Sequence, residues 1–308
     1  MKDGARSPVA SLWFANASRI AICGWSALPR VAYATSVNDG LEEQVDAEGS
    51  VKGRRKSLPG MTVKDGYTPH PFDIENGVRT SGLIAGRHLV SGHRHDRHNT
   101  AYYGVAPSVF RDMMARWRRC KPPVPIDAYT FVDFGAGMGR AVLLAAEFPF
   151  RAVVGVELNP TLARIAQKNL TRWRAADRAK APMRILCHDA LEYKFPDGHC
   201  VAFLFNPFGA PVMRRLLAEI AQSFAERPGQ LDLLYVNNEH DGVLQRQAGF
   251  QRLFVGQVRR WRADAIADHA ILANQPDGEY ASANYEDCSV WRWVGTAAAD
   301  RAKTGQEK

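Results

Sequence analysis

The stretch that decides the fold is Phe131-Val-Asp-Phe-Gly-Ala-Gly-Met-Gly-Arg-Ala-Val-Leu-Leu-Ala-Ala-Glu147. Its first residues are β-prone and apolar except for Asp133, which predicts a buried strand. Residues 141–147 strongly favour a helix. We therefore expect a strand, a tight glycine turn that brings bare backbone against a ligand, and a helix that begins at once. Unpaired N–H groups and the positive dipole end of such a helix would face the turn.

The glycine spacing narrows the class of ligand. Gly135, Gly137 and Gly139 form Gly-x-Gly-x-Gly, and Arg140 stands where a dinucleotide fingerprint wants its third glycine. Asp133 lies two residues before the first glycine, where its charge would repel a pyrophosphate but attract an amino or sulfonium cation. A nucleotide-dependent oxidoreductase remains a rival interpretation, which the position of Arg140 disfavours.

Two further strands that end in acids follow the glycine turn. Residues 151–157 are apolar and end in Glu157, and residues 183–190 form a strand that ends near Asp189. Between them, Asn159 and Pro160 are typical of an N-cap and a first helical residue. Three acids after three strands, together with the glycine turn, are a far more specific pattern than the turn alone.

These residues resemble motif I and the following strands of the class I S-adenosylmethionine-dependent methyltransferases, over about residues 126–295. The resemblance implies an α/β fold, a doubly wound, Rossmann-like sheet of seven strands whose last strand is antiparallel, with an N-terminal helical cap. It also implies S-adenosylmethionine as cofactor, with Glu157 accepting both ribose hydroxyls from an exposed strand end and Asp189 reading the adenine amino group. The cofactor-binding residues implied in this way are Asp133, Gly135, Ala136, Gly137, Gly139, Glu157, Asp189, Ala190 and Asn206.

A fourth apolar strand, residues 200–205, leads into Asn206-Pro207-Phe208. This place matches motif IV of the same methyltransferases, beside the transferred methyl group. The resemblance implies that Asn206, Pro207 and Phe208 are catalytic and that Asn206 and a backbone carbonyl accept hydrogen bonds from a target nitrogen. Amine-methylating members have two prolines in this motif, whereas this chain has one, so an Asn-Pro turn that merely ends a strand is the alternative.

The segment before the glycine stretch is expected to form the cap. A helix should begin at Pro107, with Phe110, Met113, Met114 and Trp117 packed in the core. In class I methyltransferases a segment in this position covers the cofactor, so Tyr102 and Tyr103 are candidates to contact the methionine end or the substrate, with simple packing as the alternative. Residues 87–98 hold four histidines among arginines, which predicts a solvated loop near the site and no metal.

The remaining segments complete the predicted organisation. Residues 1–60 are expected to be a disordered or loosely packed extension, 61–125 the cap, 126–295 the methyltransferase domain, and 296–308 a polar tail. Further strands are expected at 231–236, 250–258 and 288–294, with a long insertion at 259–287. Residues 11–37 are too interrupted by charge for a membrane helix, so no membrane partner is expected.

Composition limits the function less than the motifs do. The 308 residues carry a formal net charge of +8, which permits an acidic partner but is spread along the chain. Five scattered cysteines without a CxxC pair favour a reducing cytoplasm. The acceptor is unknown, with a weak preference for a lysine-like nitrogen on a protein. RNA or small-molecule methylation, and a non-catalytic cofactor-binding protein, are the alternatives, and the sequence leaves the oligomeric state open.

Overall fold

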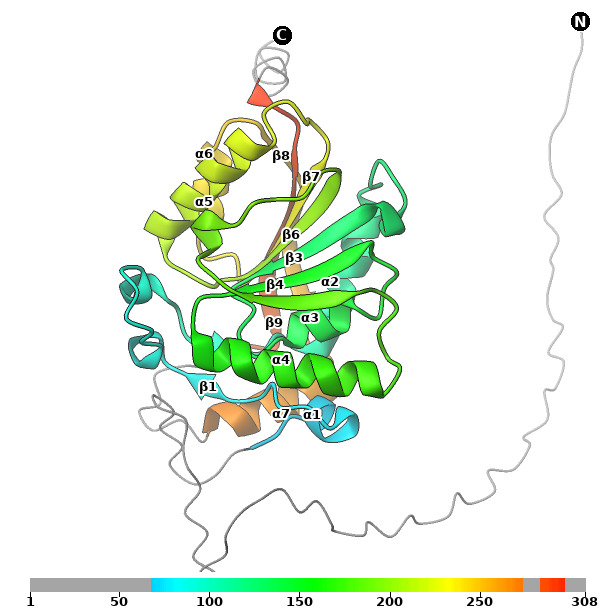
Figure 1. The fold of residues 1–308 in the computed structure, drawn as a ribbon, viewed down its shortest axis with the longest axis vertical. Helices are drawn as coiled ribbons and strands as arrows, with labels where there is room; N and C mark the ends of the chain where they lie inside the picture. Colours follow the sequence, from blue (N-terminus) through cyan, green and yellow to red (C-terminus); the bar gives the residue numbers. More distant parts are fainter. Residues whose placement is uncertain (1–67, 274–282, 297–308) are drawn as a thin grey trace, which may run out of the picture. The chain divides into compact units, whose positions relative to one another are not determined.

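The computed structural model describes residues 68–273 and 283–296, and their central feature is a seven-stranded sheet in the order β5-β4-β3-β6-β7-β9-β8 (Figure 1). Its strands are β3 (Tyr129–Phe134), β4 (Ala152–Glu157), β5 (Met183–Cys187), β6 (His199–Phe205), β7 (Leu231–Val236), β8 (Phe250–Arg259) and β9 (Tyr285–Trp293). The helices are α1 (Pro71–Asn76), α2 (Pro107–Arg119), α3 (Arg140–Ala145), α4 (Pro160–Ala175), α5 (Ala210–Ser223), α6 (Asp241–Arg246) and α7 (Arg262–Ala273). The predicted extension at 1–60 lies outside the described residues, as does the predicted polar tail at 296–308 except for its first residue.

The strand order creates a natural binding edge beside β3. Strands β3, β4 and β5 follow one another outward to one side, whereas β6 returns to the other side of β3. All neighbours among β5, β4, β3, β6 and β7 run parallel, and β9 runs antiparallel to both β7 and β8. Such a reversal of strand order leaves a crevice at the carboxyl ends of the strands. The predicted doubly wound, seven-stranded fold with an antiparallel last strand is confirmed.

Alternating side chains of the strands build two hydrophobic layers, one on each face of the sheet. On one face Phe131 and Phe203 pack with α2, α3 and α4, including the fully buried Phe110 and Trp117 predicted for the core. On the other face Val132 and its neighbours pack with α5 and α6. Figure 1 shows these two sets of helices on opposite sides of the sheet. None of the helices within the described residues is both long and apolar enough to cross a membrane.

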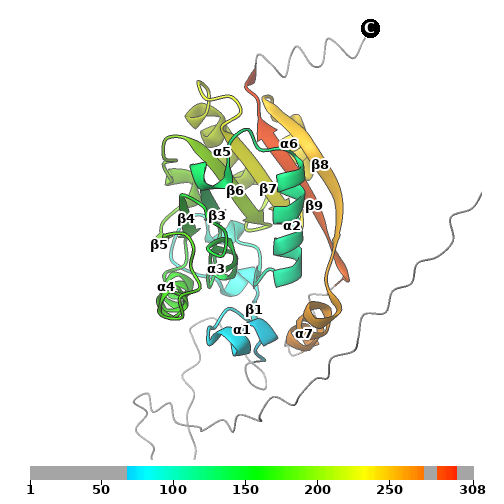
Figure 2. The same ribbon diagram turned by 90° about the vertical axis from the view of Figure 1, so that its right-hand side faces the viewer.

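The C-terminal part differs from the predicted insertion at both of its ends. Strand β8 extends to Arg259 and β9 begins at Tyr285, so the two form a long antiparallel pair at the sheet edge (Figure 2). The connection between them contains α7. The cross-strand pairing of residues 250–259 with residues 285–293 explains the extra length, because it supplies backbone partners that a single strand lacks.

The described residues before α2 form α1, the short strands β1 (Leu83–Ile84) and β2 (Tyr102–Tyr103), and two 3₁₀ turns, η1 (Gly86–His88) and η2 (Asp96–His98). Strands β1 and β2 pair antiparallel, away from the main sheet. At the start of α1, His70 caps the helix through Nδ1, which accepts from the N–H of Phe72 at 3.0 Å. On its other side, His70 Nε2 lies 3.6 Å from the Asp264 carboxylate, and this contact links α1 to α7.

Candidate active site

A cavity at the carboxyl ends of β3, β4 and β5, here called the first cavity, gathers most of the predicted cofactor-binding residues. Its lining includes Tyr102, Tyr103, Asp133, Gly135, Ala136, Gly137, Glu157, Asp189, Ala190, Pro207 and Phe208. Strand register explains part of this convergence, because Asp133 of β3 stands beside Gly155 of β4, two residues before Glu157. The parallel strands therefore deliver their terminal acids to one edge of the sheet. Gly139 and Asn206 are not part of this lining.

Glu157 is buried, which corrects the expectation of an exposed strand end. Its carboxylate accepts hydrogen bonds from the N–H of Gly137 at 2.6 Å and the N–H of Asn159 at 2.8 Å. Burial raises the pKa of Glu157, and the backbone N–H donors oppose that rise. Glu157 therefore joins the glycine turn to the start of α4 as well as facing the cavity.

Asp133 is the second acid of the first cavity. Its side chain is 3% exposed, and burial raises its pKa to about 8, with the nearby charge of Glu157 adding to the rise. A carboxyl in this state is largely protonated at neutral pH, and a cationic group placed beside it would favour its ionised form. The arrangement suits a ligand that brings a positive charge to this point.

Three N–H groups of the glycine turn, which precede the first residue of α3, already have acceptors in the protein. The N–H groups of Gly135 and Ala136 donate to the carbonyl of Val156 at 2.9 and 3.0 Å, and Gly137 donates to Glu157. The cause is the parallel pairing of β3 with β4, which brings the end of β4 against the turn. A ligand here would be recognised by side chains more than by the backbone donors of these three residues.

Protein groups also occupy the space left by two of the glycines. A Cβ on Gly135 would lie 2.4 Å from Cβ of Pro207, and a Cβ on Gly137 would lie 2.2 Å from Cε2 of Tyr102. Both glycines have positive φ, 74° and 54°, which side chains disfavour. The absence of side chains at these two glycines therefore lets Pro207 of motif IV and Tyr102 of β2 pack against the turn. Tyr102 is itself buried and donates its hydroxyl to the carbonyl of Thr80 at 2.7 Å, so packing accounts for much of its role.

Asp189 is engaged by a residue from the histidine-rich segment. One of its oxygens accepts from the N–H of Leu191 at 3.0 Å, and the other lies 3.0 Å from Nδ1 of His95. His95 is buried and lines the first cavity, so the prediction of a solvated loop is wrong for this residue. No local pattern indicates this contact, because 94 positions separate the two residues.

His93, His95 and Asp189 come close enough to raise the question of a metal. Their potential ligand atoms lie within 4.8 Å of one another, with His93 Nε2 3.8 Å from the Asp189 carboxylate. However, Nη1 of Arg215 lies 3.0 Å from Nε2 of His95. A guanidinium can only donate, so Nε2 accepts and Nδ1 carries the proton that it donates to Asp189. The three groups thus form a complete Arg–His–Asp chain, and the adjacent cation opposes metal binding.

A second cavity adjoins the first and contains Asn206. The two share Thr100, Ala101, Tyr103 and Phe205 in their walls. Asn206 is buried, its Oδ1 accepts from the hydroxyl of Tyr235 at 3.1 Å, and its Nδ2 donates to Glu239 at 2.8 Å. These partners fix the amide orientation, because a carboxylate can only accept. Of the predicted motif, Asn206 faces the second cavity, whereas Pro207 and Phe208 line the first.

The backbone of motif IV is covered by the segment before β2. The hydroxyl of Thr100 donates to the carbonyl of Asn206, and the N–H of Thr100 donates to the carbonyl of Pro207 at 3.4 Å. Asn99 forms an isolated antiparallel bridge with Phe208. The backbone carbonyls that the resemblance offers to a target nitrogen therefore already have a protein donor. Thr100 is a site residue that sequence reasoning missed.

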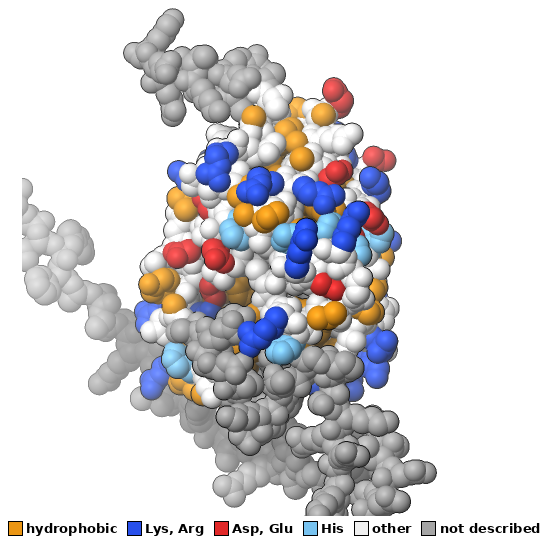
Figure 3. Space-filling view, turned by 90° about the vertical axis from the view of Figure 1, so that its left-hand side faces the viewer, with side chains coloured by type: hydrophobic (Ala, Val, Ile, Leu, Met, Phe, Trp, Pro, Cys, Tyr) orange, Lys and Arg blue, Asp and Glu red, His pale blue; other side chains and the backbone are white. Residues whose placement is uncertain are grey.

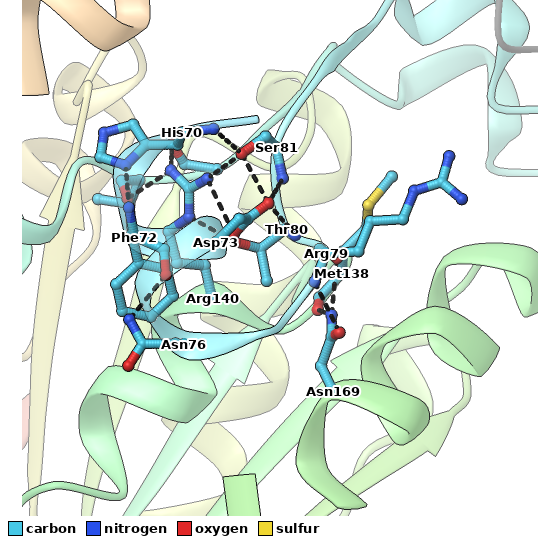
Figure 4. A network of polar contacts seen from close by, with 12 residues as sticks. His70, Phe72, Asp73, Asn76, Arg79, Thr80, Ser81, Met138, Arg140 and Asn169 are labelled. Carbon is cyan, nitrogen blue, oxygen red and sulfur yellow. Dashed lines mark hydrogen bonds and ion pairs between the residues drawn. The ribbon is translucent and has the colours of Figure 1, made fainter. Parts of the chain in front are cut away.

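Arg140 explains why the third glycine of a dinucleotide fingerprint is absent. Its buried guanidinium donates to the hydroxyls of Thr80 at 2.7 Å and Ser81 at 3.0 Å, and to the carbonyl of Gly104 at 3.2 Å (Figure 4). The carboxylate of Asp73 accepts hydrogen bonds from the hydroxyls and the backbone N–H groups of the same Thr80 and Ser81. The first helical residue of α3 therefore anchors residues 73–105 beside the glycine turn.

Residues 132–224 match the family model described as a methyltransferase domain. No curated protein matches the chain. Among solved structures, the chain is similar to the [4+2]-cyclase SpnF, with 18% identity over 60% of this chain and 82% of that one and a TM-score of 0.44.

Two further similar structures contain bound SAM or S-adenosyl-L-homocysteine. The magnesium protoporphyrin IX methyltransferase of Synechocystis PCC 6803, with bound SAM, shares 13% identity over 59% of this chain and 78% of its own, with a TM-score of 0.38. An RNA methyltransferase from Salinibacter ruber, in complex with S-adenosyl-L-homocysteine, shares 16% identity over 59% and 90%, with a TM-score of 0.35. The match to a methyltransferase domain covers residues 132–224, the part of the chain that holds the glycine turn, Glu157, Asp189 and Asn206, and it supports S-adenosylmethionine as the cofactor.

Proposed function

We propose that this protein is an S-adenosylmethionine-dependent methyltransferase that methylates a nitrogen on a protein, on a lysine-like side chain. The observation that carries the proposal is the convergence of Asp133, Glu157 and Asp189 in the first cavity, which shares a wall with a second cavity at Asn206. The four cysteines within the described residues are unpaired, which supports a reducing compartment such as the cytoplasm.

The residues of the first cavity fit the cofactor by their chemistry. Glu157 would accept the two ribose hydroxyls, Asp189 the adenine amino group, and Asp133 would face the positively charged methionine end. Bound there, S-adenosylmethionine would supply an electrophilic methyl group on its sulfonium. The carboxylates can take these contacts in addition to their protein donors, because each carboxylate offers about four lone-pair sites.

The protein's contribution to methyl transfer is positioning and exclusion of water. Asn206 is held by Tyr235 and Glu239, and its Oδ1 keeps a second lone pair for an acceptor N–H. An acceptor in the second cavity would reach the first across the shared wall, which includes Phe205 and Tyr103. This route supports a function for Asn206 beyond ending a strand.

The alternative of an RNA acceptor has less support from the surface in Figure 3. Lysine and arginine side chains are distributed over this face, with acidic side chains and histidines between them. Nucleic-acid binding usually relies on a continuous basic groove with aromatic residues for stacking. RNA nevertheless stays the second class to be tested, because the net charge of the chain is +8.

Two measurements test the proposal. Isothermal titration calorimetry should detect S-adenosylmethionine and S-adenosylhomocysteine binding to the purified protein, with NADH as a control that does not bind. Lysate incubated with the protein and radiolabelled cofactor should then give label that protease releases and nuclease does not. Cofactor binding without label in any fraction would favour a non-catalytic binding protein, and nuclease-sensitive label would favour RNA.

A further inference from the structure

The second cavity has its own chemistry, distinct from that of the first. It lies at the carboxyl ends of β6 and β7 and beside the start of β9, and its lining includes Asn206, Asn237, Glu239, Tyr285 and Asp287. The carboxylates of the first cavity are buried, whereas Glu239 and Asp287 are exposed. Charges placed at an open mouth act on whatever approaches from solvent.

The charges around this cavity do not cancel. Within residues 68–273 and 283–296, Glu239 and Asp287 have no lysine or arginine partner within 4.0 Å. Arg260, which also lines the cavity, lies between two acids of its own, with its Nε 3.4 Å from Asp268 and its Nη2 bonded to Glu286. The buried guanidinium is thus compensated by its neighbours. The described lining therefore presents a negative field to an entering group.

The remaining walls suit an apolar stem. Tyr103 and Phe205 lie with their ring centroids 6.5 Å apart, and the lining also includes the half-exposed ring of Tyr285. Aromatic faces attract alkylammonium cations and pack against methylene groups. Asn206 is buried in the same lining and follows Phe205, one of the residues that the two cavities share.

Resting on the proposed function, we propose that the second cavity is the acceptor site and that it binds an aliphatic amine in its alkylammonium form. Glu239 and Asp287 attract the cation, the aromatic walls hold its stem, and Asn206 orients the nitrogen. The alternative is that the second cavity is a solvent-filled space between strand ends and binds no ligand. A neutral heteroaromatic nitrogen, as in a nucleobase, would gain nothing from the two carboxylates.

Methyl transfer from S-adenosylmethionine to such an amine requires no group beyond the amine, the cofactor and water. The ammonium first loses one proton to water at the open mouth, which leaves a lone pair on nitrogen. That pair forms the new N–C bond while the S–C bond breaks, and the electron pair of the broken bond stays on sulfur as a neutral thioether. Neither an oxidant nor a reductant is needed.

The test uses the full chain saturated with S-adenosylhomocysteine and two small probes, n-butylamine and its neutral analogue 1-butanol. Saturation-transfer NMR titrations at pH 7.5 should show n-butylamine binding at least about tenfold more tightly than 1-butanol. Glu239→Gln should weaken n-butylamine binding about threefold to tenfold, and Asp287→Asn should act in the same direction. The matched control is Glu219→Gln, which removes the same charge from an exposed position of α5 outside both cavities.

The outcomes separate the two proposals. Equal binding of both probes, or equal effects of Glu239→Gln and Glu219→Gln, would overturn the acceptor site while calorimetric binding of S-adenosylmethionine left the proposed function standing. Absence of cofactor binding would overturn the proposed function instead. A further arm distinguishes the sources of the amine: label in protease-sensitive material indicates a lysine side chain, and label in the fraction below about 3 kDa indicates a free amine. Nuclease-sensitive label would contradict an alkylammonium acceptor.

Discussion

The two neighbouring cavities hold their acids in opposite ways. In the first cavity Asp133, Glu157 and Asp189 are all less than a tenth exposed, and two of them are fixed by backbone N–H donors. In the second, Glu239 and Asp287 stand in solvent, and only Glu286, which is paired with Arg260, is buried among the acids of the described lining. Burying a carboxyl costs stability unless it is hydrogen-bonded, and in the first cavity this cost shows at Asp133, whose pKa burial raises to about 8. The exposed carboxylates of the second cavity can only favour the entry of cations, because solvent and salt screen exposed charges.

This difference predicts that substitutions in the first cavity change cofactor affinity, whereas those in the second change turnover. It also predicts that pH acts on the first cavity through buried acids.

Gly137→Val should abolish measurable cofactor binding. The new side chain would collide with the ring of Tyr102, 2.2 Å from its Cβ, at a φ of 54° that valine disfavours. Calorimetry with S-adenosylmethionine measures the loss, and circular dichroism reports whether the sheet remains. Gly229→Val is the control, because Gly229 also has positive φ, 80°, but its Cβ would meet nothing within 4 Å. Retained binding in Gly137→Val would show that the turn does not shape the cofactor site.

Asn206→Ala should lower turnover by about 10²-fold, the scale of a lost positioning group, while cofactor affinity changes by less than about 1 kcal/mol. The reason is that its amide faces the second cavity rather than the first. Single-turnover assays with the labelled acceptor fraction and calorimetry measure the two quantities. Because Asn206 has a φ of 41°, Asp177→Ala controls for backbone strain: Asp177 has a φ of 52° and lies outside both cavities. If turnover and cofactor affinity fell together, Asn206 would belong to the cofactor site instead.

Glu157→Ala should weaken cofactor binding by about 1.5–3 kcal/mol, the range for hydrogen bonds to a charged group. It should also lower the free energy of unfolding of the ligand-free protein, because the N–H groups of Gly137 and Asn159 lose their acceptor. Glu157→Gln keeps one carbonyl acceptor, so its cofactor affinity and its free energy of unfolding should lie between those of the wild type and of Glu157→Ala. Calorimetry and urea unfolding give the numbers. Unchanged cofactor affinity in Glu157→Ala would refute its assignment to the ribose.

Cofactor affinity should rise with pH below about 8. The pKa of Asp133 is raised to about 8, so the ligand-free carboxyl is protonated at neutral pH, and a cationic ligand must displace that proton. Binding therefore strengthens as pH rises toward 8, by at most about tenfold per pH unit, and levels off above it. Calorimetry in two buffers of different ionisation enthalpy counts the released proton. Asp133→Asn isolates this effect from titration of the ligand, and an identical pH slope in the variant would contradict it.

Local pattern was enough to predict most of the sheet. The strand at 129–134, the cap at Asn159 and the buried stripe of α2 follow from short-range signals, namely β-prone apolar runs, an N-cap before proline and helical spacing. The ends of β8 and β9 were less accessible, because their length depends on pairing with each other. The described residues before α2 carry too little periodicity to predict, and contacts such as Asp73 with Thr80 decide their path.

The sequence by itself determined the strand–turn–helix at the glycine stretch, the acids at three strand ends, and the Asn-Pro-Phe motif after a fourth strand. Those features are local, so each residue's neighbours in the chain suffice to specify them. Only the tertiary structure decided that Glu157 is buried, that His95 engages Asp189, and that Asn206 faces a cavity of its own. These contacts join residues far apart in the chain, and packing of whole elements, not local propensity, brings their side chains together.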